Sequence, residues 1–298
     1  MTSEHFFPPR NFGNLSAADS DFQTAQVVVL PVPYDSTTSF KAGAREGPQA
    51  IIDASQELEL YDIELGCEIS QVGIHTLTDV MPALGGPEQM VQRVEEVVGD
   101  LLDKGKKLAM LGGDHSITVG AVRAFHKRYP HLSVLQLDAH ADLRDQYLGT
   151  GYSNASVMRR IREVCPAVQV GIRSLSVDEH QFISEKGLEL FYAKEAPLTP
   201  DSIDRIVSRL SEQVYITIDL DVFDSSIMAA VGTPQPGGLG WHEVLRLLKT
   251  VAQKRQVVSF DLVELSPSEG PTACAFLAAK LAYKLVGYIT LPLPQLSI

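Results

Sequence analysis

Three polar side chains follow one apolar run near the middle of the chain. Residues 132–137 are mostly apolar, and Asp138, His140 and Asp142 come directly after them. Alternate side chains of an extended segment share one face, so these three can point together into one pocket. Carboxylate and imidazole donors in this arrangement suit a divalent cation, although a solvated polar turn has a similar composition.

Three more polar side chains follow apolar runs elsewhere in the chain, namely His115, Asp219 and Asp221. Together with the first group they make four carboxylates and two imidazoles. Carboxylates gathered in a pocket of low dielectric constant repel one another unless cations hold them. Two divalent ions about 3.5–4 Å apart supply a suitable charge, with Asp138 and Asp219 as the natural bridging ligands. Oxygen-rich donors without thiolates favour Mn²⁺, while Fe, Co and Zn stay open.

Apolar runs alternate with segments of helical spacing along the chain. The predicted strands are residues 27–30, 108–111, 132–137, 168–171, 188–192, 214–218, 257–263 and 286–291. The predicted helices are one that begins at residue 47 and those at 87–102, 117–128, 153–164, 202–210, 241–251 and 273–285. This alternation predicts right-handed βαβ units and a mainly parallel sheet covered on both faces. Ligands of such sheets bind at the carboxyl ends of the strands, where the polar groups lie.

Composition restricts the class of protein and its partners. The chain has 298 residues, of which 45% are hydrophobic, and a formal net charge of −12. This charge argues against a nucleic-acid-binding surface and is compatible with a cationic substrate. Three scattered cysteines indicate a reducing cytoplasm, and Lys280 and Lys284 interrupt the longest apolar stretch. We therefore expect a cytoplasmic protein that avoids membranes, with one domain over residues 1–298 and an irregular arm at 1–25.

Four segments, in order, resemble the signature segments of the ureohydrolases, the arginase and agmatinase family of binuclear manganese enzymes. They are residues 112–116 (GGDHS), 138–142 (DAHAD), 219–224 (DLDVFD) and 259–267 (SFDLVELSP). The similarity extends from Pro31 to the C-terminal helix, and residues 142–149 and the loop at 34–48 are more similar to agmatinases than to arginases. The resemblance implies an arginase-like, three-layer α/β/α fold with a mainly parallel, roughly eight-stranded sheet. It also implies a homo-oligomer, a trimer or a hexamer.

The resemblance also implies two Mn²⁺ ions per subunit and a small cationic guanidino substrate. One ion would be held by His115, Asp138, Asp142 and Asp219, and the other by His140, Asp138, Asp219 and Asp221. Glu264 would pair with the substrate guanidinium, whose planar fork matches a carboxylate, and Thr233 would line the same end of the pocket. The implied reaction is attack of metal-activated hydroxide on the guanidinium carbon, followed by collapse to urea and an amine, a step of polyamine biosynthesis.

Two departures from the family pattern bear on activity. Asn154 stands where the family usually has a histidine that shuttles protons or assists the leaving amine. An amide cannot relay a proton, and losing an acid/base group typically costs ~10²–10⁴ in rate. We therefore predict an intact metal site with impaired proton transfer, and assign catalytic roles to Asp142, Asn154 and Glu264. Residues 225–230 also lack the family's prolines and glycine, which changes the loop beside Asp221.

Three hypotheses follow from these residues. The leading one is a manganese-dependent, agmatinase-like hydrolase of a guanidine with a linear tail. A related enzyme would act on guanidinobutyrate, aminopropylagmatine, formiminoglutamate or arginine. A protein of a different class would be a catalytically silent homologue that binds metal for regulation or assembly. Asn154 favours this last hypothesis, whereas retention of all six metal donors and Glu264 speaks against it.

Overall fold

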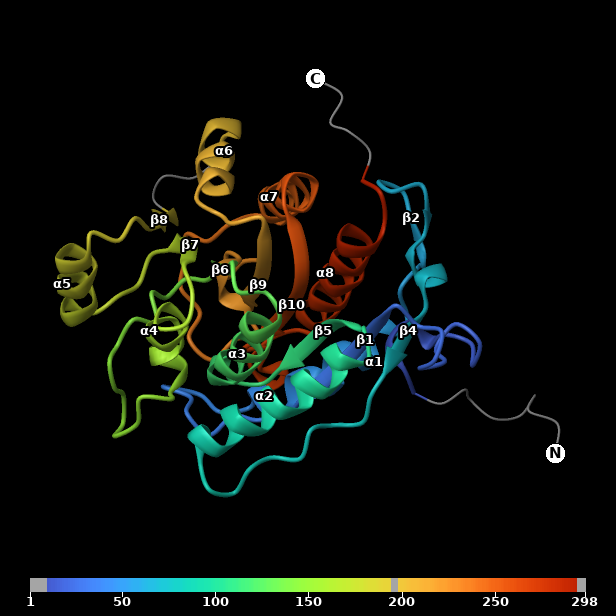
Figure 1. The fold of residues 1–298 in the computed structure, drawn as a ribbon, viewed down its shortest axis with the longest axis horizontal. Helices are drawn as coiled ribbons and strands as arrows, with labels where there is room; N and C mark the ends of the chain where they lie inside the picture. The colour runs from blue at the N-terminus through green and yellow to red at the C-terminus, as the bar shows by residue number, and fades with distance from the viewer. Residues whose placement is uncertain (1–9, 194–197, 294–298) are drawn as a thin grey trace.

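One eight-stranded parallel sheet runs through the computed structural model, which describes residues 10–193 and 198–293 (Figure 1). Its order is β4-β1-β5-β10-β9-β6-β7-β8, and these neighbouring strands are all parallel. The strands are β1 (Val27–Val32), β4 (Ile74–Thr76), β5 (Lys107–Gly112), β6 (Leu132–Leu137), β7 (Ala167–Ile172), β8 (Phe191–Tyr192), β9 (Gln213–Asp219) and β10 (Gln256–Val263). The predicted fold class is confirmed.

Helices cover both faces of this sheet (Figure 1). They are α1 (Gly47–Ser55), α2 (Pro87–Asp103), α3 (Thr118–Arg128), α4 (Val157–Arg162), α5 (Val177–Lys186), α6 (Pro200–Ser208), α7 (Trp241–Lys254) and α8 (Ala273–Thr290). Apolar side chains of α1, α6, α7 and α8 belong to one core layer, and those of α2 to α5 belong to the other. Alternate residues of a strand enter opposite layers, as Val134 and Leu135 do, so the central strands are apolar on both faces.

The topology brings four polar segments to one edge. The strands β5, β10, β9 and β6 are neighbours at the centre of the sheet, although they are far apart in the sequence. Because they are parallel, their carboxyl ends meet at the same edge. His115 follows β5, Glu264 follows β10, Asp219 ends β9 and Asp138 follows β6. The fold therefore gathers these residues through strand order rather than through closeness in the chain.

The predicted last strand, at residues 286–291, is wrong. Helix α8 continues to Thr290, because an apolar run beside a buried helix reads equally well as helix or strand. By length and composition α8 is apolar enough to cross a membrane, but 72% of it is buried inside the protein. Its Lys284 is buried too, and bonds to Asp62 and Glu64 of the hairpin formed by β2 (Tyr61–Asp62) and β3 (Cys67–Glu68). Helix α8 is thus a core helix.

Two other segments differ from the prediction. The predicted helix at 153–164 consists of a 3-10 turn, Asn154–Ser156, followed by the short α4. Helix α5 was not predicted, although Ser176 and Glu179 form a capping box at its start. Within the predicted irregular arm, the described residues from 10 onward contain one 3-10 turn, Phe12–Asn14, whereas residues 1–9 lie outside the described part of the chain.

Candidate metal centre

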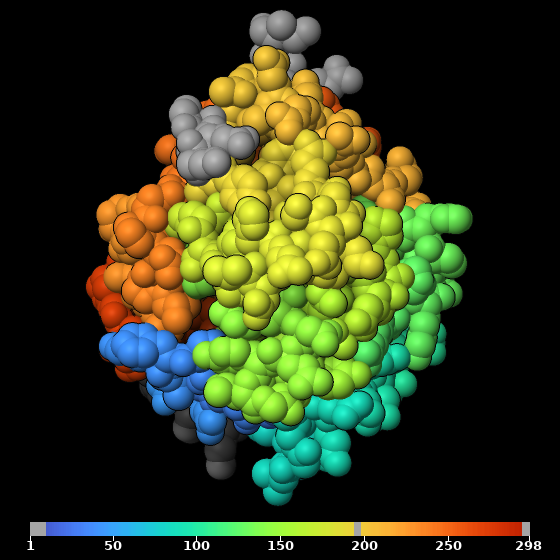
Figure 2. Space-filling view, turned by 90° about the vertical axis from the view of Figure 1, so that its left-hand side faces the viewer, coloured from blue at the N-terminus to red at the C-terminus, as the bar shows by residue number. Residues whose placement is uncertain are grey.

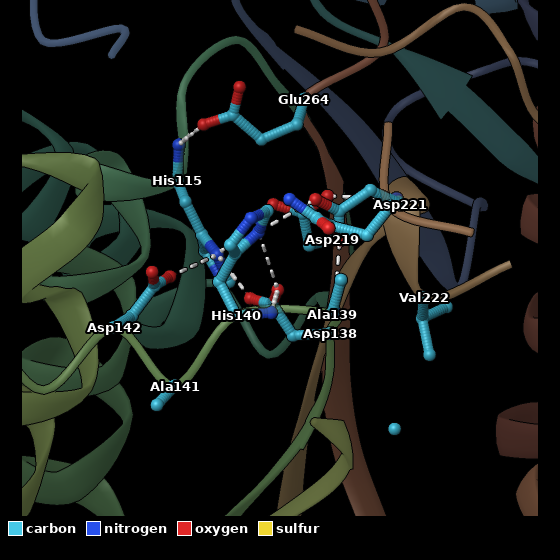
Figure 3. A network of polar contacts seen from close by, with 12 residues as sticks. His115, Asp138, Ala139, His140, Ala141, Asp142, Asp219, Asp221, Val222 and Glu264 are labelled. Atoms are coloured by element: carbon cyan, nitrogen blue, oxygen red, sulfur yellow. Dashed lines mark hydrogen bonds and ion pairs between the residues drawn. The ribbon is translucent and has the colours of Figure 1, made fainter. Parts of the chain in front are cut away.

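The six predicted metal donors converge at the carboxyl edge of the central strands (Figure 3). His115 Nδ1 lies 3.3 Å from Asp138 Oδ2, 3.3 Å from Asp142 Oδ2 and 3.7 Å from Asp219 Oδ2. His140 Nδ1 lies 2.9 Å from Asp221 Oδ2 and 3.7 Å from Asp138 Oδ1. The donors thus form two clusters that share one carboxylate, that of Asp138.

Each cluster is compact enough to hold one cation. Donor atoms of His115, Asp138 and Asp219 lie within 4.8 Å of one another, and so do those of Asp138, His140 and Asp221. Asp142 lies beside the first cluster. Asp219 belongs to the first cluster, and its predicted share in the second ion stays a prediction.

Main-chain groups fix the orientation of the carboxylates. Asp138 Oδ1 accepts a hydrogen bond from the His140 amide, at 2.6 Å. Asp221 Oδ1 accepts one from the Ala139 amide, at 3.0 Å, which joins the end of β9 to the end of β6. Asp219 Oδ1 accepts one from the Asp221 amide, at 2.9 Å. Since these bonds come from the loops themselves, the carboxylates are positioned by the backbone.

The ring of His115 is oriented so that Nδ1 can bind a cation. Its Nε2 lies 2.8 Å from the hydroxyl oxygen of Thr217, and that hydroxyl donates to Asp261 Oδ1 at 2.6 Å. Because the hydrogen of the Thr217 hydroxyl points to Asp261, the Thr217 oxygen can only accept from His115 Nε2–H, which leaves the lone pair of a neutral ring on Nδ1. This atom is buried, has no hydrogen-bond partner in the described part of the chain, and faces three carboxylates. The donor set fits a divalent cation.

Protons take up part of the charge when the cluster holds no cation. Burial raises the pKa of Asp142 to about 7, with the nearby Asp138 carboxylate adding to the effect. Burial also raises the pKa of Glu264 to about 8, together with the Asp114 carboxylate. Burial by itself lowers the pKa of His140, but Asp138 and Asp221 raise it to about 11. Such a cluster releases protons when it takes up metal ions.

Glu264 and Asp142 have the left-handed backbone conformation that non-glycine residues rarely adopt. Their φ angles are +67° and +52°, and such a conformation costs about 1–3 kcal/mol. The Glu264 amide donates to Gly113 O at 2.8 Å, and its Oε1 accepts from the His115 amide at 2.8 Å. The turn after β10 therefore holds the Glu264 carboxylate against the main-chain amide of His115, beside the cluster (Figure 3).

A cavity of about 240 Å³ opens over the cluster. Its walls include six of the predicted donors and substrate-binding residues, namely His140, Asp142, Asp219, Glu264, Thr233 and Asn154. The other wall residues include Ser39, Arg144, Tyr147, Glu179 and Ser174–Ser176. Figure 2 looks onto this side of the molecule, where the blue, green and orange segments of the chain meet. Thr233 and Asn154, which are predicted to contact the substrate, thus both line this cavity. The volume suits a small ligand.

Asn154 is held by its neighbours. Its Oδ1 accepts from the Ala155 amide at 2.8 Å and from the Ser39 hydroxyl at 3.5 Å. Its own amide N–H donates to Thr37 Oγ1, at 2.9 Å. These contacts occupy the side-chain oxygen, so the Nδ2 group is the part of Asn154 that can donate to a bound molecule.

The loop after Asp221 keeps a defined shape without the family's prolines. Asp224 Oδ1 accepts from the Ser226 amide, and Oδ2 accepts from the amides of Gly237 and Gly238. A hydrogen bond with the Ser226 side chain, together with these amide bonds, lowers the pKa of Asp224 to about 2. Arg173 also donates to Asp221 O at 2.6 Å. Side-chain hydrogen bonds thus replace the backbone restriction that proline supplies.

Sequence reasoning missed the residues behind the donors. Asp261 is fully buried and accepts hydrogen bonds from Thr217, Tyr215 and Thr118. It lies inside an apolar strand, where an acidic residue is unusual. An acidic residue at such a position was the feature of the sequence that could have identified Asp261. Asp114 accepts from the Ser116 amide at 3.1 Å and so caps the 3-10 turn His115–Ile117.

Clustered histidines and aspartates at the carboxyl edge of a parallel sheet define a metal-dependent α/β hydrolase. Comparison with known proteins agrees with this class. The sequence model described as "Arginase family" matches residues 25–287. The N(1)-aminopropylagmatine ureohydrolase of Synechocystis sp. is 40% identical over 92% of each chain. The agmatinase of Pyrococcus horikoshii is 35% identical over 90% of this chain and 93% of its own.

Solved structures agree as well. The agmatine ureohydrolase of Thermoplasma volcanium superposes with a TM-score of 0.85 at 32% identity, and covers 96% of both chains. Proclavaminate amidino hydrolase from Streptomyces clavuligerus has the same TM-score at 30% identity. The chain belongs to the arginase family, and it is a hydrolase of the ureohydrolase type.

Proposed function

We propose that this protein hydrolyses a guanidino compound with a linear cationic tail, such as agmatine, to urea and an amine, using two Mn²⁺ ions. The observation that carries the proposal is the pair of donor clusters that share Asp138, beneath a cavity that Glu264 lines. Nitrogen and oxygen donors without sulfur favour Mn²⁺ over softer metals. Family membership supports the hydrolytic chemistry.

The chain's own residues bind and orient the substrate. The Glu264 carboxylate accepts the N–H groups of the guanidinium in a planar, paired arrangement. Thr233 borders the same end of the cavity, and Asn154 offers its Nδ2 group to the substrate but cannot take up or release a proton. When bound, the two ions supply activation of a water molecule for attack on the guanidinium carbon. Asp138 and the other donors hold them in place.

The test is urea release from a panel of guanidines after Mn²⁺ loading, with the parent and Asn154→His measured together. We expect the parent to act slowly on agmatine or a related amine, and the variant to gain up to ~10²-fold in kcat, because imidazole restores a proton-transfer group. The relevant control is Ser39→Ala, which alters a neighbour of Asn154 without adding an acid/base group. No urea from any guanidine with either protein would exclude the proposal and favour a catalytically silent homologue.

A longer substrate is the second candidate. Relatives at 40% and 42% identity are named N(1)-aminopropylagmatine ureohydrolases, whereas the agmatinases compared are at 35% or below. We infer that an aminopropyl extension of the tail is accepted as well. The comparison of kcat/KM for agmatine and for aminopropylagmatine decides which substrate is preferred, and no turnover of aminopropylagmatine would exclude the extension.

A further inference from the structure

Two glutamines interrupt the apolar interior of the sheet beneath the metal centre. Gln136 in β6 and Gln169 in β7 are both fully buried and lie directly opposite each other in the paired strands. Burying an amide costs free energy unless hydrogen bonds satisfy it. Gln136 also shares its face of the strand with Asp138, two residues further on. A polar path therefore leads from the sheet interior to the shared carboxylate.

A continuous chain of hydrogen bonds follows this path. Arg162 Nε and Nη2 donate to Gln169 Oε1, at 3.2 and 3.1 Å. Gln169 Nε2 donates to Gln136 Oε1, at 2.6 Å. Gln136 Nε2 then donates to Asp138 Oδ2, at 2.7 Å. The chain starts at a cation in α4 and ends at the carboxylate that both donor clusters share.

Only one direction is possible along this chain. A guanidinium has donors alone, so the Gln169 atom that faces Arg162 must be the oxygen. The Gln169 amino group must then face Gln136 and the carbonyl of Ala141, which lies 2.7 Å away and can only accept. The Gln136 oxygen is thereby occupied, and its amino group must point to Asp138. Among the residues that the structure describes, no carboxylate pairs with Arg162. Its Nη2 donates to Ala167 O, at 2.9 Å, as well as to Gln169 Oε1.

Gln169 also holds the loop that carries two other donors. Ala141, whose carbonyl accepts from Gln169, lies between His140 and Asp142. Asp142 has a φ of +52°, a conformation that needs support from its surroundings. The buried Gln169 amide group thus bonds directly to the strained loop, and is linked to the shared Asp138 carboxylate through Gln136.

We propose that Arg162, Gln169 and Gln136 are positioning residues for the metal centre. Their directional hydrogen bonds fix the plane of the Asp138 carboxylate, with one oxygen turned to each donor cluster. The His140 amide holds Oδ1 and Gln136 holds Oδ2, and each oxygen keeps a free lone pair for one cation. The inference rests on the proposed binuclear site.

The experiment measures the Mn²⁺ dissociation constants of the metal-free protein, by titration with free Mn²⁺ followed by electron paramagnetic resonance. In Gln136→Leu the side chain keeps its approximate size but loses the donor to Asp138. We expect Mn²⁺ binding about 10–100-fold weaker, the usual effect of removing a partner of a metal ligand. The free energy of unfolding of the metal-free variant is measured in parallel, and we expect it to stay close to that of the parent.

Ser133→Ala is the matched control. Ser133 lies in the same strand, is fully buried, and accepts a hydrogen bond from the Ser211 amide at 2.9 Å. Its loss perturbs the sheet without touching the chain of hydrogen bonds. We expect its stability to fall and its Mn²⁺ affinity to stay that of the parent, the opposite of Gln136→Leu.

Substitutions of Arg162, at the outer end of the chain of hydrogen bonds, give a second test that stays informative if Gln136→Leu fails to fold. Arg162 is half-buried, so Arg162→Met and Arg162→Lys are both tolerable substitutions. Lysine has only donors and keeps the direction of the chain, so we expect Arg162→Lys to stay within about threefold of the parent. Arg162→Met removes the donors that fix the direction of the hydrogen bonds, and we expect it to weaken Mn²⁺ binding about tenfold or more.

The outcomes separate this inference from the proposed function. If the parent binds no Mn²⁺, the proposed binuclear site fails. If the parent binds two ions per chain while Arg162→Met and every folded Gln136→Leu sample bind them as tightly as the parent, the positioning role is wrong and the site stands. Weaker binding in Arg162→Met with rescue in Arg162→Lys supports the positioning role.

Discussion

Glu264 combines a costly backbone conformation with a buried carboxylate. Its φ of +67° is held by the hydrogen bond from its amide to Gly113 O, and its side chain is 8% exposed. Such strain persists where the surrounding structure requires one side-chain direction. At the residue scale, the charge of this carboxylate is therefore what we expect to matter for substrate binding.

Glu264→Gln removes that charge and keeps the size of the side chain. We expect kcat/KM to fall, and the fall to correspond to a loss of about 2–5 kcal/mol of transition-state stabilisation. This is the usual cost of removing one partner of a buried charge pair. Mn²⁺ affinity should change little, because Glu264 is outside both donor clusters. Urea assays and Mn²⁺ titrations check both. Thr233→Val is the control, because it changes a neutral residue at the same end of the cavity. An unaltered kcat/KM in Glu264→Gln would contradict the role assigned to the Glu264 charge.

At the scale of elements, the turn after β5 depends on one close backbone contact. A Cβ atom on Gly113 would lie 1.9 Å from the main-chain oxygen of Tyr34, in the segment after β1. The same oxygen accepts from the Asp114 amide, next to His115. The ends of β1 and β5 can thus approach closely only because residue 113 has no side chain.

Gly113→Ala should therefore destabilise the fold by about 3 kcal/mol, since backbone must move to admit the methyl group. Urea-induced unfolding measures the change. Gly99→Ala in α2 is the matched control, because its methyl group meets nothing within 4 Å, and alanine stabilises a helix interior by roughly 0.5–1 kcal/mol relative to glycine. Equal stability of the two variants would refute the contact.

A second element, the β2–β3 hairpin, is attached to α8 by a charge cluster around the buried Lys284. Lys284 is 3.1 Å from Asp62 Oδ1 and also bonds to Glu64, and Lys249 lies 2.9 Å from Glu64 Oε1. Burial alone raises the pKa of Glu64, but its bonds with Lys284, Lys249 and Tyr288 lower it to about 2 from an ordinary 4.5. Folding therefore favours the charged form of this carboxyl.

The stability that Glu64 contributes should depend on pH. A carboxyl with a lowered folded-state pKa stabilises fully above its unfolded value and loses the effect as the pH falls through the folded one. We expect Glu64→Gln to be less stable than the parent at neutral pH, and the difference to shrink between pH 4.5 and about 2. Free energies of unfolding across that range test this, with Glu57→Gln, an exposed carboxylate, as control. A difference that is constant with pH would oppose it.

At the scale of the whole molecule, acidic groups from three strand ends meet in a protein whose net charge is already −12. Bound cations relieve that repulsion, and they bind only the folded chain. At a free Mn²⁺ concentration a hundred times the dissociation constant, binding adds about 2.7 kcal/mol to stability. The metal centre should therefore stabilise the fold as a whole.

Chelation tests this. We expect EDTA to lower the Tm of the Mn²⁺-loaded protein by about 5–10 °C, given about 2–4 °C per kcal/mol for large domains. Differential scanning calorimetry measures the shift. The His115→Ala variant should show a smaller shift, because one donor cluster is incomplete. Identical Tm values with EDTA and with excess Mn²⁺ would contradict stabilisation by metal.

Much of this organisation could be predicted from the sequence, because strand ends and donor spacing are local patterns. The alternate spacing of Asp138, His140 and Asp142 after an apolar run placed all three correctly at the sheet edge. Helix α8 was harder, because an apolar run that is buried all round has no period that separates helix from strand. Gln136 and Gln169 were missed because their pairing depends on which strands are neighbours, and strand order is not a local property.

The two donor clusters differ in their access to water. The His115 side chain is fully buried, whereas that of His140 is 24% exposed and borders the cavity. The first cluster borders the cavity only through Asp142 and Asp219, whose side chains are 10% and 7% exposed. An ion there should exchange more slowly than one beside His140, so we expect rapid mixing with a chelator to release the pair in two successive phases.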